Sequence, residues 1–105
     1  MSAKIELIDV AKPIATILAR AGVLEAYFFG SFARGDDDKF SDVDILLVDW
    51  GTATNEQLLA AISEIETLLS KKIDLVDSRS LPAHVLATAL AERVPLLSRS
   101  LSLNQ

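Results

Sequence analysis

Cysteine is absent from this 105-residue chain, and histidine, tryptophan and tyrosine each occur only once. Without cysteine the chain can form neither a disulfide framework nor a thiolate metal site. It has no apolar run long enough to span a membrane, and its N-terminus lacks the basic region and apolar core of a signal peptide. These absences favour a cytoplasmic protein that does not enter the membrane.

Positive charge is also scarce, with 10 Lys and Arg against 15 Asp and Glu. A protein that binds the phosphate backbone of a nucleic acid needs a basic surface, so direct nucleic-acid binding is not expected. A function as an enzyme that acts on RNA ends fits the acidic net charge poorly. Half of the residues are hydrophobic and the mean hydropathy is +0.35, which is high for so small a domain. We therefore expect some apolar surface to lie against another chain, in a homo- or hetero-oligomer.

The periodicity of apolar residues predicts one domain over residues 1–105 with alternating helices and strands. The firm part of the first helix is expected to begin at Pro13, because proline is well tolerated only in a helix's first turn, and to stop at Gly22. An amphipathic lead-in without a defined start precedes it, up to about Lys12. The other expected elements are strands over 23–29, 42–49, 73–77 and 95–98, and helices over 54–71 and 82–93. This order predicts an α+β fold with a mixed β-sheet flanked by helices.

Both later helices have recognisable faces. Thr54 and Gln57 match a capping box. The expected apolar stripe of the 54–71 helix comprises Leu58, Leu59, Ile62, Ile65, Leu68 and Leu69, with Glu66 among its solvated charges. The expected core face of the last helix comprises Val85, Leu86, Ala89 and Leu90, whereas His84 is expected to be exposed.

Two carboxylates open the second strand. Asp42 and Asp44 are two residues apart, so their side chains share one face of a strand, at backbone positions about 7 Å apart. Carboxylates this close repel each other unless a proton or a cation intervenes, and Mg²⁺ is the natural oxygen-liganded cation. Parity separates Asp49 from Asp44, and Asp77 from Asp74, so Asp49 and Asp77 are expected to point elsewhere.

The first strand ends at Gly30-Ser31, where a helix is expected to begin. A helix N-terminus binds phosphate through its free N–H groups and partial positive charge, and Gly30 lets a ligand approach the backbone. The Ser31 hydroxyl and the Arg34 guanidinium could add contacts to the phosphate. A Gly-Ser pair alone is more often a turn and a helix cap, but next to the paired acids it favours phosphate binding.

These features together resemble a known signature. Ten residues separate Gly30-Ser31 from Asp42-Val43-Asp44, as in the polymerase-beta-type nucleotidyltransferase superfamily. The segments 30–35 and 41–45 are similar to its minimal nucleotidyltransferase branch, whose members are often antitoxins paired with a HEPN-domain protein. The resemblance implies the polymerase-beta-like fold and a third acid on a later strand, which Asp74 supplies.

The resemblance also implies an activity: transfer of AMP from ATP to a hydroxyl, in toxin-paired members a tyrosine of the HEPN partner. Asp42, Asp44 and Asp74 would ligate two Mg²⁺ ions, and the phosphates would lie on Gly30, Ser31 and Arg34. A small-molecule acceptor such as an aminoglycoside usually comes with an additional domain. The alternative is a non-catalytic antitoxin that neutralises its partner by contact alone, although such a binder has no need of three converging carboxylates.

Overall fold

The computed structural model describes residues 7–30, 33 and 42–98. The elements are α1 (Leu7–Arg20), β1 (Glu25–Phe29), β2 (Val43–Asp49), α3 (Asn55–Leu69), β3 (Ile73–Asp77), the 3₁₀ turn η1 (Ser78–Ser80), α4 (Ala83–Glu92) and β4 (Val94–Leu97). The strands form one sheet in the order β3-β2-β1-β4, in which β2 and β3 are parallel and the other pairs antiparallel. The predicted α+β architecture with a mixed sheet is confirmed.

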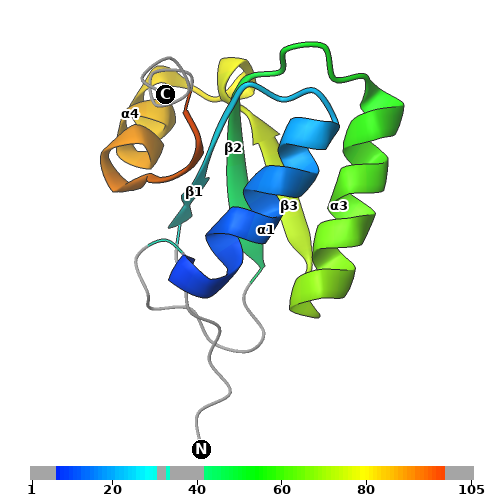
Figure 1. Ribbon diagram of the computed structural model, residues 1–105. Helices are drawn as coiled ribbons and strands as arrows, with labels where there is room; N and C mark the ends of the chain where they lie inside the picture. The colour runs from blue at the N-terminus through cyan, green and yellow to red at the C-terminus, as the bar shows by residue number, and fades with distance from the viewer. Residues whose placement is uncertain (1–6, 31–32, 34–41, 99–105) are drawn as a thin grey trace, which may run out of the picture.

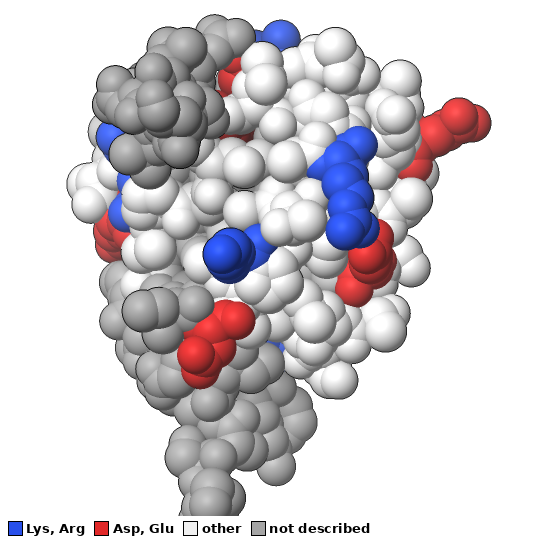
Figure 2. All heavy atoms as spheres, viewed as in Figure 1, with Lys and Arg blue, Asp and Glu red and all other residues white. Residues whose placement is uncertain are grey.

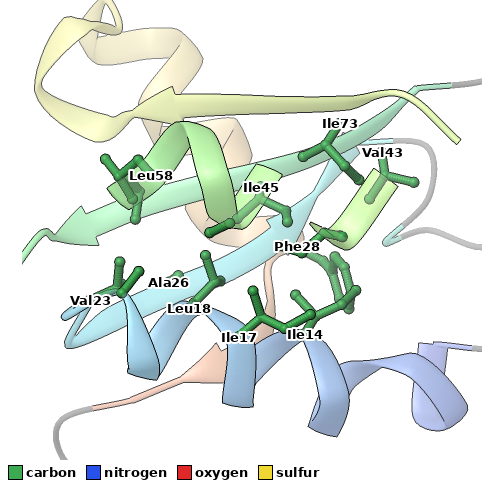
Figure 3. Packing of buried hydrophobic residues seen from close by; sticks show 14 of the residues in the cluster. Ile14, Ile17, Leu18, Val23, Ala26, Phe28, Val43, Ile45, Leu58 and Ile73 are labelled. Carbon is green, nitrogen blue, oxygen red and sulfur yellow. The ribbon is translucent and has the colours of Figure 1, made fainter. Parts of the chain in front are cut away.

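One face of the sheet is covered by α1 and α3, which lie side by side (Figure 1). Alternate strand residues point toward these helices, as the two-residue period of a strand requires. Phe28 of β1 and Ile45 of β2 are fully buried there against Leu18 of α1 (Figure 3). This cluster is the main hydrophobic core.

The opposite face of the sheet is covered by α4 on the β1 side. Tyr27 of β1 and Leu46 of β2 have the other parity, and both are buried without belonging to the main core. In α4 only Ala89 is buried among the described side chains, so the expected core face of Val85, Leu86, Ala89 and Leu90 is wrong in its extent.

The N-terminal helix extends further back than its proline suggested. Pro13 lies inside α1, six residues after Leu7. Its missing N–H removes only the bond to the Asp9 carbonyl, at a cost of about 3 kcal/mol in a helix interior. Full burial of Ile14 and Leu18 contributes about 1.5–3 kcal/mol each, which offsets that loss. Packing therefore overrides the local preference that placed the helix start at Pro13.

The α3 helix has the predicted capping box: Gln57 N donates to Thr54 Oγ1 at 3.1 Å, and Thr54 N donates to Gln57 Oε1 at 2.9 Å. The predicted apolar stripe is too wide. Leu59 and Leu68 are 66% and 48% exposed, whereas Ala61, which the stripe omitted, is buried. A helix packed on a sheet buries only its innermost band, so apolar residues at its margins stay in solvent.

One acid of α3 has a structural contact that was not expected. Glu66 Oε2 accepts a hydrogen bond from the Ile73 backbone N at 2.9 Å, in a half-buried position. The prediction that Glu66 is simply solvated is therefore wrong. This contact, together with the Val43 N–Lys72 O bond at 2.9 Å, places the first residues of β3 beside β2.

The exposed face of α1 and α3 is mostly uncharged (Figure 2). A groove runs between the two helices, lined by Pro13, Thr16, Ile17, Arg20, Thr67 and Leu68, among others. Among the described helices, none has the length and apolar character needed to cross a bilayer.

Candidate active site

A row of three residues crosses the sheet on the face turned away from α1 and α3. Asp44 of β2 is the register partner of Asp74 on the parallel strand β3. It is also the register partner of Phe29 on the antiparallel strand β1. Register partners project to the same face from strands about 4.8 Å apart. Asp74 and Asp44 therefore lie side by side, and Phe29 follows them in the row.

Asp44 is the most perturbed acid of this row. Its side chain is half-buried, and burial is the main reason why its pKa is raised above the ordinary value of 3.8. The negative charges of Asp74 and then Asp42 raise this pKa further. Asp42 is exposed and immediately precedes β2 instead of starting it, yet its charge still reaches Asp44. Two acids thus act electrostatically on one half-buried carboxylate.

Gly30 brings the backbone against this carboxylate. It follows β1 with a φ of +77°, a conformation that favours glycine. A Cβ atom at this position would lie 2.5 Å from Asp44 Oδ2, closer than a side chain tolerates. The glycine therefore allows the end of β1 and the Asp44 side chain to meet. Ser31 and Arg34, the other expected phosphate contacts, lie outside the described residues.

The donor chemistry of the site fits a hard cation. Carboxylate oxygens are the ligands that Mg²⁺ prefers, and a divalent ion would relieve the repulsion that Asp44 experiences. Within residues 7–30, 33 and 42–98, no group of three His, Cys, Asp or Glu side chains is already arranged as a metal site. Like charges do not converge by themselves, so a bound cation would have to draw Asp42, Asp44 and Asp74 together.

Comparison with known proteins decides the family. Residues 12–102 match the family described as polymerase beta, nucleotidyltransferase. The chain belongs to this nucleotidyltransferase family. Among curated relatives of this nucleotidyltransferase, "Putative protein adenylyltransferase" of Methanocaldococcus jannaschii is 32% identical over 90 residues, which cover 85% of this chain and 96% of the relative. "Protein adenylyltransferase MntA" of Thermococcus cleftensis is 40% identical over 76 residues, which cover 71% and 76% of the two chains.

Solved structures share the fold of this nucleotidyltransferase. "Structure of putative minimal nucleotidyltransferase" superposes with a TM-score of 0.76 at 26% identity, covering 90% of this chain and all of the other. A toxin–antitoxin structure with AMP-PNP has a TM-score of 0.65 at 22% identity and covers 86% and 75%. A tri-AMPylated HEPN toxin in complex with its MNT antitoxin from Shewanella oneidensis has a TM-score of 0.65 at 19% identity and covers 94% and 78%. The predicted polymerase-beta-like fold is confirmed.

Strand parity predicted that Asp49 and Asp77 point away from the other acids, and both have structural contacts in this nucleotidyltransferase. Asp77 Oδ1 accepts from the Arg79 backbone N at 3.0 Å, and the Arg79 guanidinium forms an ion pair with Asp77 at 3.0 Å. The Arg79 hydrogen bond is the main cause that lowers the pKa of Asp77. Asp49, the last residue of β2, accepts from Gly51 N at 2.9 Å. Both carboxylates stabilise turns at the far ends of their strands.

Asp44 should make the stability of the metal-free nucleotidyltransferase depend on pH. Because its folded-state pKa is raised above 3.8, the folded chain binds this proton more tightly than the unfolded chain. The stabilisation is complete below the unfolded pKa and is lost as the pH rises through the folded pKa. In EDTA, the Tm of Asp44→Asn minus that of the wild type should therefore increase from about pH 4 to about pH 7. A difference that shrank over this interval would contradict the raised pKa.

Proposed function

We propose that this nucleotidyltransferase transfers AMP from ATP to a protein hydroxyl, most directly a tyrosine of a HEPN-type toxin, and so acts as an antitoxin. The observation that carries the proposal is Asp44, half-buried, in register with Asp74 and against the Gly30 backbone. The relatives named protein adenylyltransferase and the fold shared with HEPN-bound antitoxins support it. The unit is one domain over residues 1–105, which would act in the cytoplasm, where ATP is available.

In this reaction the acceptor hydroxyl oxygen forms a bond to the α-phosphorus of ATP. The bond between that phosphorus and the oxygen bridging to the β-phosphate breaks, and pyrophosphate leaves. Asp74 is exposed at the open side of the row, where its carboxylate can receive the hydroxyl proton. The products are the AMP ester of the acceptor and pyrophosphate, with the proton passing to solvent.

The other residues would position the nucleotide. Asp42 and Asp44, with Asp74, would bind Mg²⁺, which neutralises charge on the triphosphate and on the leaving pyrophosphate. The backbone at Gly30 would approach the phosphates closely, with Ser31 and Arg34 as the further predicted contacts. Catalysis in such a site would come from positioning and electrostatics.

The transfer can be tested with ATP labelled at one phosphate at a time. The chain is incubated with Mg²⁺, a purified HEPN-domain partner from the same genome, and ATP labelled at either the α- or the γ-position. We expect the partner to acquire label from α-labelled ATP only, and to lose this labelling when its acceptor tyrosine is replaced by phenylalanine. A stable complex that acquires no label would instead support neutralisation by contact alone.

A further inference from the structure

Next to Asp44 and Asp74, which we call the acid row, the end of β1 and one side of α4 border an open hollow of about 270 Å³. Phe29 and Gly30 line it at the end of β1, and His84, Val85, Thr88, Ala89 and Glu92 line it from α4. We call these seven residues and the space between them the α4 hollow. Its volume is below the range of about 300–1,000 Å³ that encloses a whole drug-sized ligand, so it suits one flat ring.

The chemistry of the α4 hollow is that of a site for an aromatic ring with polar edges. Phe29, Val85 and Ala89 supply apolar surface, and His84, Thr88 and Glu92 supply the polar groups. Thr88 Oγ1 donates its hydrogen to the His84 carbonyl at 3.2 Å. Its lone pairs are thus available to accept an N–H from a ligand at the rim.

The position of the α4 hollow relative to the acids selects the ring. Phe29 is the register partner of Asp44, so the hollow begins on the strand next to Asp44, whose backbone is about 4.8 Å away. Asp74, the acid on the acceptor side, lies one strand away in the opposite direction. Gly30 borders both the hollow and the Asp44 carboxylate. A ring in the hollow would therefore belong to the molecule whose phosphates lie at Gly30, and not to the acceptor.

We propose that the α4 hollow binds the purine base of the nucleotide substrate, with one ring face against Phe29 and Val85 and an exocyclic amino group near Thr88. This inference rests on the proposed function, since it assumes that ATP phosphates bind between Gly30 and Asp44. It assigns base binding to α4, a helix that carries none of the three acids.

Photo-crosslinking locates the base directly. Trypsin cleaves after Lys72, Arg79 and Arg93, so the peptide 80–93 contains all of α4 and the peptide 73–79 contains β3 with Asp74. With Mg²⁺ and 8-azido-ATP, we expect the label in peptide 80–93, and excess ATP should prevent it. Label confined to peptide 73–79 would place the base on the acceptor side and overturn the proposal.

A filling substitution gives a second readout. Val85 is 37% exposed, so Val85→Trp can occupy the α4 hollow without disturbing the core, and Ala87→Trp, at an exposed position outside the hollow, is the matched control. Base stacking predicts that Val85→Trp raises the Kd for AMP-PNP about tenfold or more. Inorganic tripolyphosphate, which has no base, should bind both variants and the wild type equally.

The possible outcomes distinguish a failure of the base site from a failure of the proposed function. If Val85→Trp leaves the Kd for AMP-PNP unchanged while Asp44→Asn weakens binding in Mg²⁺, the phosphate site stands and the base lies outside the α4 hollow. An equal loss of AMP-PNP and tripolyphosphate binding in Val85→Trp would also overturn the assignment. If the wild-type chain binds neither probe with Mg²⁺, the proposed function fails together with the inference.

Discussion

Asp44→Asn is expected to reduce AMP transfer at least about 100-fold, because a preorganised electrostatic contact of this kind contributes that much to kcat. Asparagine keeps the size of the side chain but removes the negative charge that would bind the cation. The fold should survive, because Asp74 and Asp42 repel the Asp44 carboxylate and the substitution removes this repulsion. The initial rate of partner labelling and the Tm in EDTA measure the two effects separately. Asp42→Asn should likewise abolish transfer and preserve the fold.

The matched control for this variant is Asp77→Asn. Asp77 lies on β3 with Asp74 but has the opposite parity, and its carboxylate pairs with Arg79 instead of facing the acid row. The control should keep the transfer rate and lose only the modest stability of an exposed ion pair, about 0–1 kcal/mol. An Asp44→Asn protein that unfolded, or that retained a rate within tenfold of the wild type, would remove Asp44 from the catalytic machinery.

Gly30→Ala is expected to impair both stability and transfer. The φ of +77° is unfavourable for alanine, at a cost of about 1 kcal/mol or more. In addition, the new Cβ would lie 2.5 Å from Asp44 Oδ2, so the carboxylate has to move. A displacement of about 1 Å in a positioned catalytic group can reduce the rate about 100-fold. Rates per folded molecule, with Tm measured in parallel, are the test.

Gly51→Ala controls for the loss of a strained and crowded glycine that lies away from the acid row. Gly51 also has a positive φ, of +59°, and its added Cβ would meet the Gly22 backbone and Leu24, far from the acid row. This variant should lose stability and keep its rate per folded molecule. If Gly30→Ala behaved in the same way as Gly51→Ala, the contact between Gly30 and the Asp44 carboxylate would have no part in transfer.

Asp44 could be anticipated because it belongs to a short apolar strand, whereas Asp74 was anticipated through the resemblance to the nucleotidyltransferase signature. The runs 26–29, 43–49 and 73–77 have little alternative to the sheet, and strand parity then separates Asp44 and Asp74 from Asp49 and Asp77. Strand parity does not predict which strands are adjacent in the sheet. The adjacency of β2 and β3 depends on how α3 crosses back over the sheet, which is a property of the packed fold.

Other features of the fold and of the site had no signal in the local sequence. The continuation of α1 through Pro13 and the exposure of Leu59 depend on which helix bands reach the sheet, and periodicity reports only that a helix is amphipathic. The α4 hollow joins Phe29 to α4 residues more than fifty positions later, and helical periodicity does not report which strand a helix faces.

The place of Asp74 on an edge strand gives the same carboxylate a second consequence. β3 is the outermost strand on its side of the sheet, and such an edge can template the addition of a strand from another molecule. Two copies aligned edge to edge would bring their exposed aspartates together, and like charges in that arrangement disfavour intermolecular sheet growth. Neutralising Asp74 would therefore favour aggregation and also remove a carboxylate from the acid row. Solubility and AMP transfer would thus depend on the same residue.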